Sequence, residues 1–95
     1  MENKPVLDFE FDIELYEEEI RSKGFCDNVR VTLPNNLMYK VCFYDPVRLQ
    51  QDIQDEHYIA IPGLLIVQEI TLEGMKKLVY ILFSSGYFNN LKPLN

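Results

Sequence analysis

Residues 7 to 15 alternate without a break between apolar and acidic side chains, and this pattern constrains the fold more than any other feature. A period of two residues is typical of a β-strand that buries one face and exposes the other. We therefore expect a strand over residues 7–15 with its acidic side in solvent. The apolar positions are Leu7, Phe9, Phe11, Ile13 and Leu15, and the acidic positions are Asp8, Glu10, Asp12 and Glu14.

The rest of the chain divides into short elements separated by turn residues. Gly24 and Gly86 can end helices, Pro62-Gly63 interrupts the chain, and Pro34-Asn35-Asn36 suits a hairpin turn. Helices are expected over 16–23, from Asp45-Pro46 to about His57, and from Thr71 to about Ser85. Further strands are expected over 28–33, 38–44 and 64–70.

The register of the predicted hairpin follows from the need to keep charged side chains off the apolar face. A two-residue loop would place Lys40 opposite Val31, so a loop longer by one or three residues is expected. Arg30, Thr32, Lys40 and Cys42 then share the other face. The expected pairs are Val29 with Phe43, Val31 with Val41 and Leu33 with Tyr39.

This order predicts a single α+β domain over residues 1–95, with a four-stranded, mostly antiparallel sheet and helices on one face. It matches the ferredoxin-like βαββαβ order with an added C-terminal helix, in which the first strand is central. Residues 1–6 and 89–95 are expected to be frayed. A chain of 95 residues is too short for two independent cores.

Composition places the chain among ordinary globular domains, with 47% hydrophobic and 25% charged residues. Its apolar runs are far shorter than the roughly 18 to 20 residues that a membrane-spanning helix needs, so no membrane association is expected. No secretory signal is recognised at the start, and a cytoplasmic location is therefore expected.

The negative charge is concentrated at one end. Residues 1–19 contain eight acids and one base, whereas the remainder contains seven acids and eight bases. Such an acidic surface is suited to docking a basic protein surface, although a solvated face neutralised by Lys40 and Arg30 remains the alternative. The candidate partner-binding residues are Asp8, Glu10, Asp12, Glu14, Glu17 and Glu18.

No motif for catalysis, a metal or a cofactor is recognised. The isolated glycines form no phosphate-binding loop, and the acids are spaced too far apart along a strand to chelate one ion compactly. His57 is the only histidine, and Cys26 and Cys42 are expected to be reduced thiols that are buried or half-buried. Carboxylates on the open sheet face disfavour nucleic-acid binding.

A second candidate contact is apolar and lies near the C-terminus. Tyr80 and Ile81 fall off the predicted core stripe of the last helix, and Tyr87 and Phe88 follow directly after it. They form an exposed partner or dimer contact unless the tail folds back over them. The sequence thus favours a non-enzymatic interaction module, an adaptor or small inhibitor. The alternatives are a regulatory small-molecule-binding domain acting as a dimer and a purely structural domain. The sequence does not separate a monomer from a homodimer.

Overall fold

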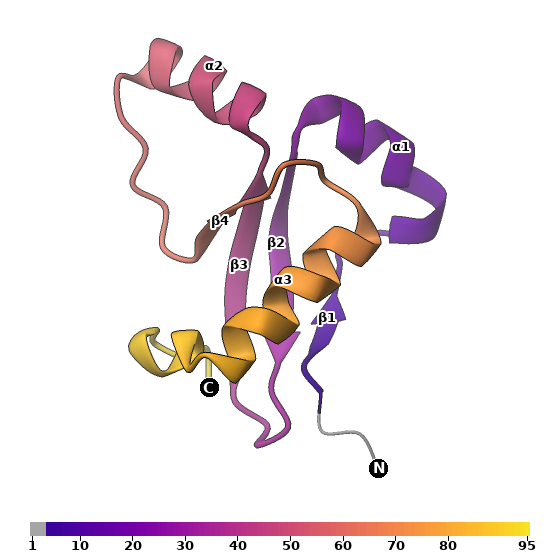
Figure 1. Ribbon diagram of the computed structural model, residues 1–95, viewed down its shortest axis with the longest axis vertical. Coiled ribbons are helices and arrows are strands. Elements are labelled where there is room, and N and C mark those ends of the chain that lie inside the picture. The colour runs from indigo at the N-terminus through magenta and orange to yellow at the C-terminus, as the bar shows by residue number, and fades with distance from the viewer. Residues whose placement is uncertain (1–3) are drawn as a thin grey trace.

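The computed structural model describes residues 4–95 and has an α+β architecture (Figure 1). The described residues form one four-stranded sheet, three α-helices and a short 3-10 helix. The elements in chain order are β1 (Val6–Asp8), α1 (Ile13–Lys23), β2 (Phe25–Thr32), β3 (Met38–Tyr44), α2 (Pro46–Glu56), β4 (Leu64–Ile66), α3 (Leu72–Ser84) and η1 (Tyr87–Asn90).

The strands are arranged in the sequential order β1-β2-β3-β4. The first two pairs are antiparallel and the pair of β3 with β4 is parallel, so the predicted α+β class with a mostly antiparallel sheet is confirmed. The ferredoxin-like arrangement is wrong, because β1 lies at an edge beside β2 and not in the centre.

The predicted strand over 7–15 is also wrong, since β1 ends at Asp8 and α1 begins at Ile13. Asp12 is the N-cap of α1, and its side chain accepts hydrogen bonds from two backbone amides of the first turn. This capping, followed by residues that favour helices, outweighs the alternating pattern. Ile13 and Ile20 are seven residues apart and share one helical face, which is the signal that the period-two interpretation missed.

The hairpin of β2 and β3 has a three-residue loop, closed by a hydrogen bond of 2.9 Å from Leu33 N to Leu37 O. Its register pairs Val31 with Tyr39 and Arg30 with Lys40. The predicted pairing was therefore displaced by two residues. A shift of two leaves each side chain on its own face, so the predicted separation of apolar and charged faces still holds.

The core lies on one face of the sheet, which we call the core face. α3 crosses this face (Figure 1), and Met75 and Val79 from α3 pack in one cluster with Val31 and Phe43. Ile20 of α1 belongs to the same cluster. The core stripe predicted for the last helix is thus confirmed: Met75 and Val79 are buried, and Leu78, Leu82 and Phe83 pack against the cluster.

α2 lies at the end of the sheet and has no buried residue. It contacts Phe25 and Tyr44, which neighbour the core residues Cys26 and Phe43 along their strands. Because side chains alternate along a strand, Phe25 and Tyr44 belong to the opposite face, which we call the open face.

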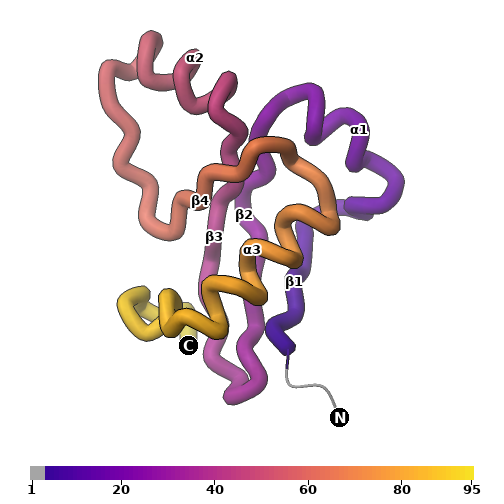
Figure 2. Tube along the Cα trace, viewed as in Figure 1, coloured from indigo at the N-terminus to yellow at the C-terminus, as the bar shows by residue number. Residues whose placement is uncertain are grey.

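The C-terminal tail is tied to the hairpin, in contrast to the expected fraying of 89–95. Leu94 N donates to Met38 O at 2.6 Å, and Asn95 Oδ1 accepts from Met38 N at 2.9 Å. Figure 2 shows the C-terminus beside the lower end of β3. Of the other segment expected to fray, 1–6, residues 1–3 lie outside the described residues, Pro5 is buried and Val6 begins β1.

Candidate functional site

The predicted acidic residues do not form a row on one strand. Asp8 lies in β1 opposite Arg30, which is itself opposite Lys40, so these three charges form a line across the sheet. Glu10 lies in the connection that follows β1, and Glu14 lies in the first turn of α1. All four of Asp8, Glu10, Asp12 and Glu14 are exposed, but they extend from the sheet edge around to the helix.

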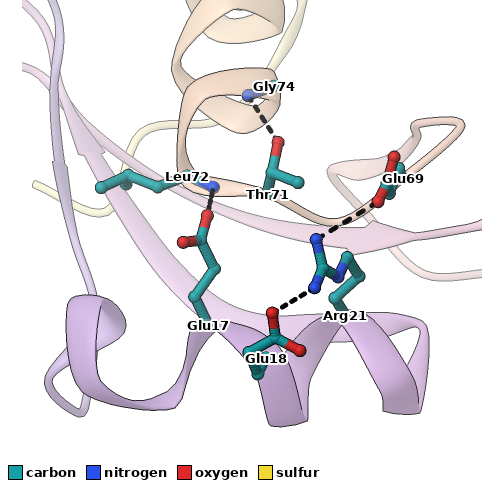
Figure 3. Close-up of polar contacts among 7 residues, drawn as sticks. All are labelled: Glu17, Glu18, Arg21, Glu69, Thr71, Leu72 and Gly74. Atoms are coloured by element: carbon teal, nitrogen blue, oxygen red, sulfur yellow. Dashed lines mark hydrogen bonds and ion pairs between the residues drawn. The ribbon is translucent and has the colours of Figure 1, made fainter.

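Two of the predicted acids stabilise the fold directly. Asp12 Oδ1 accepts from Glu14 N at 3.1 Å and from Leu15 N at 3.4 Å. Glu17 Oε2 accepts from Leu72 N at 2.7 Å, so it satisfies an amide at the start of α3 (Figure 3). A carboxylate at a helix N-terminus is stabilising because it meets unpaired amides and the positive end of the helix dipole. Asp12 and Glu17 are therefore structural residues.

Glu18 is paired with Arg21 of the same helix, and Arg21 also lies 3.5 Å from Glu69 (Figure 3). The hydrogen bond to Glu18 is the largest cause of a raised pKa of Arg21, to which the charges of Glu18, Glu69 and Glu17 also contribute. The side chain of Glu18 is nonetheless 84% exposed. It remains accessible to a partner.

The outer side of α1 presents apolar side chains among these acids, which sequence reasoning missed. Leu15 is 70% exposed and Tyr16 is 43% exposed. The alternating pattern predicts Leu15 on the buried side of a strand. The helix that replaces this strand turns Leu15 outward, since it is two residues from Ile13 and five from Ile20 on a helix of 3.6 residues per turn.

A groove of about 340 Å³ adjoins Tyr16. Phe11 forms one wall, and its ring meets that of Tyr16 edge-on at 6.3 Å between centroids. Glu19 and Lys23 lie at the rim. We call the exposed set on this side of α1 the α1 surface, and it consists of Glu14, Leu15, Tyr16, Glu18 and Glu19.

The second predicted contact is not one exposed patch. Phe88 is buried, and its ring lies 5.2 Å from that of Tyr39 and 5.4 Å from that of Tyr87. Tyr80 is half-buried, with the ammonium of Lys4 at 5.5 Å from its ring centroid. Only Ile81 is largely exposed. The aromatic residues after Gly86 belong to the core because η1 turns them back onto the end of α3.

A larger pocket, of about 500 Å³, lies on the open face. Lys40, Cys42 and Asp27 form its floor, and Ile61 and Lys92 lie on its walls. Burial, together with the charge of Asp27, raises the pKa of Cys42 to about 11. Cys42 is therefore a neutral thiol near pH 7, and both it and Cys26 are buried and free, as the sequence predicts.

Among residues 4–95, no three His, Cys, Asp or Glu side chains are grouped so that they could hold a metal ion. Within the same residues, no helix combines the length and the apolar character needed to cross a membrane. Comparisons of the chain with protein-family models, with curated proteins and with solved structures found no match.

Proposed function

We propose that this chain is a non-enzymatic protein-interaction module whose α1 surface binds a basic segment of a partner protein. The observation on which the proposal rests is Leu15, a large apolar side chain that is 70% exposed in the middle of an acidic helix surface. Contiguous exposed apolar side chains with a polar rim mark protein-binding sites, and Leu15 lies next to exposed Tyr16 and its groove in this way.

The other side of α1 is held firmly, which gives the surface a fixed shape. Ile20 is buried in the core, and Glu17 bonds to the first amide of α3. A preorganised surface loses little conformational entropy when it binds. The partner would therefore meet Leu15 and Tyr16 in positions that are set before contact.

Charge gives the surface its selectivity. Residues 1–19 contribute −7 to a chain of net charge −6, and Glu14, Glu18 and Glu19 surround the apolar side chains. Such a potential speeds encounter with a basic surface and disfavours acidic ones. An apolar side chain of the partner would occupy the groove lined by Phe11, Tyr16 and Ile20, and Lys or Arg residues of the partner would meet the carboxylates.

The alternative of a dimeric small-molecule-binding domain, formed through the last helix and tail, has less support. It requires Tyr87 and Phe88 to be available, but Phe88 is buried and Tyr87 packs against the core. A purely structural domain would not account for Leu15 and Tyr16 being exposed side by side.

The test uses the full chain as bait in a lysate of the source organism, with proteins eluted by increasing salt. Leu15→Ser and Glu14→Lys should each reduce capture of a partner that the parent chain retains. For Leu15→Ser we expect the binding affinity to fall by about fivefold or more, because Leu15 would anchor the contact. Matched controls are Ile81→Ser, which also truncates an exposed apolar side chain, and Glu73→Lys, which also reverses a first-turn acid.

Both controls should retain the partner, which should elute at high salt because surface charge pairs are screened. Capture that is equal for all four variants, or that is insensitive to salt, would contradict the proposal. Urea unfolding of each variant verifies that lost capture does not reflect lost folding.

A further inference from the structure

The pocket on the open face is bounded by segments that are far apart in the sequence. Its floor is formed by β2 and β3, one wall by the loop before β4, and another by the C-terminal tail. Lys40 and Cys42 alternate with the core residues Val41 and Phe43, so they point away from the core. The pocket is thus separate from the α1 surface, which lies on another part of the molecule.

The floor owes its shape to a β-bulge in β2. The pairing shifts between Cys26 and Val29, and Asn28 adopts a left-handed backbone conformation with φ of 55°. A non-glycine residue in this conformation is held there at a cost by its surroundings. Bulges redirect side chains and are frequent beside functional sites. Here the bulge places Asp27 and Asn28 at the pocket.

The loop wall is fixed by a close approach of two backbones. Cys42 N donates to Gly63 O at 3.0 Å, and a Cβ on Gly63 would lie only 2.5 Å from Lys40 O. Glycine is therefore needed at this position, where φ is also +75°. The contact holds Ile61 and Pro62 against the floor.

The tail wall is fixed by hydrogen bonds to the hairpin. Besides the two bonds to Met38, Asn95 Nδ2 donates to Asn36 O at 2.9 Å. These bonds bring Lys92 and Leu94 to the rim of the pocket. Leu94 is 58% exposed, and Ile61 is also exposed, so the pocket presents apolar side chains that the fold leaves in solvent.

The side chains that line the pocket carry a net positive charge, whereas the whole chain carries a net negative charge. Two ammonium groups, of Lys40 and Lys92, line it together with one carboxylate, of Asp27. Within residues 4–95 neither ammonium lies in an ion pair, although the chain has fifteen acids and nine bases. Unpaired cations beside an apolar wall are suited to an anionic group joined to an apolar body.

We propose that this pocket binds a small organic anion whose carboxylate, sulfonate or phosphate meets Lys40 and Lys92 and whose aromatic or branched body contacts Phe25 and Ile61. A hydrogen-bond donor on the ligand would meet Asp27. The volume of about 500 Å³ lies within the range of roughly 300 to 1,000 Å³ that is usual for small-molecule sites.

The test uses 1-anilinonaphthalene-8-sulfonate, which combines a sulfonate, an N–H donor and aromatic rings, with fluorescence titration of the full chain. We expect saturable binding that weakens by about tenfold in the double variant Lys40→Gln, Lys92→Gln, because this variant removes both ammonium groups that would pair with the sulfonate. The uncharged analogue N-phenyl-1-naphthylamine should bind equally to the parent and to this variant.

The matched control, Lys76→Gln with Lys77→Gln, removes the same charge from a shallow groove on α3 and should bind the sulfonate like the parent chain. In an amide NMR titration, signals of Asn28, Lys40 and Lys92 should shift most. Equal weakening in both double variants, shifts concentrated on α1, or no saturation below about 1 mM would each overturn the proposal.

Discussion

The helices α1 and α2 are alike in length and capping, but they differ in how they pack against the rest of the protein. Each has eleven residues, begins after an aspartate N-cap and ends at a residue with a left-handed backbone, Gly24 in α1 and His57 in α2. α1 buries Ile20 and bonds through Glu17 to α3, whereas α2 has no buried residue. Figure 2 shows α2 projecting beyond the end of the sheet.

What holds α2 is a polar and aromatic contact. Tyr44 Oη donates to Asp52 at 2.7 Å, Arg48 Nε donates to Asp52 at 3.0 Å, and the Arg48 guanidinium lies 4.4 Å from the centroid of the Phe25 ring. Capping residues are sufficient to define where each helix begins and ends. How firmly the helix is attached depends on the tertiary contacts that its side chains make.

The largest expected effect is the difference in stability lost when a side chain of α1 or of α2 is truncated. Ile20→Ala should lower the free energy of unfolding by about 2 to 5 kcal/mol, because it leaves a cavity in the core. Ile53→Ala removes the same atoms from α2, where the side chain is 42% exposed, and should cost less than about 1 kcal/mol. Urea unfolding measures both, and equal losses would show that α2 is as firmly packed as α1.

The second prediction compares the two C-caps. Gly24→Ala should cost about 1 to 3 kcal/mol, because φ is +78° and the new Cβ would lie 2.8 Å from the Asp45 carboxylate that caps α2. His57 is a non-glycine residue in a left-handed conformation, with φ of 69°, and His57→Gly removes this strain. The free energy of unfolding should rise by about 0.5 kcal/mol once the greater entropy of glycine in the unfolded chain is subtracted. Thermal unfolding of both variants checks the opposite signs.

The third prediction concerns the attachment of α2. Tyr44→Phe should cost about 0.5 to 1.5 kcal/mol below pH 9, through the lost hydrogen bond to Asp52. That bond and burial raise the pKa of Tyr44 from 10 to about 12, so its contribution is complete below pH 10 and is lost as the pH rises towards 12.

The difference in stability between the parent chain and Tyr44→Phe should therefore shrink over pH 10 to 12. The raised pKa values of Cys26 and Cys42 lower the stability of both proteins in the same alkaline range, so the comparison uses the difference between the two proteins at each pH. A difference that is constant with pH would show that Asp52 does not hold the Tyr44 hydroxyl.

The later elements were predicted well because their signals are local. Asp45-Pro46 and Thr71 begin helices as expected, and the stripe of α3 faces the core. The predicted fourth strand over 64–70 is only Leu64–Ile66. The first segment was predicted wrongly because the alternation of residues 7–15 continues past the end of β1 into the first turn of α1, where the helical spacing of Ile13 and Ile20 competes with it. The candidate acids were located on the surface, but the structural roles of Asp12 and Glu17 were not foreseen.

The sequence by itself determined the α+β class, the caps, the two faces of the hairpin and the concentration of negative charge, because these depend on residues that are close in the chain or on composition. Only the tertiary structure decided the strand order, the bond from Glu17 to Leu72, the outward position of Leu15 and the pocket between Lys40 and Lys92. Each of these depends on contacts between distant segments, whose geometry no local pattern encodes.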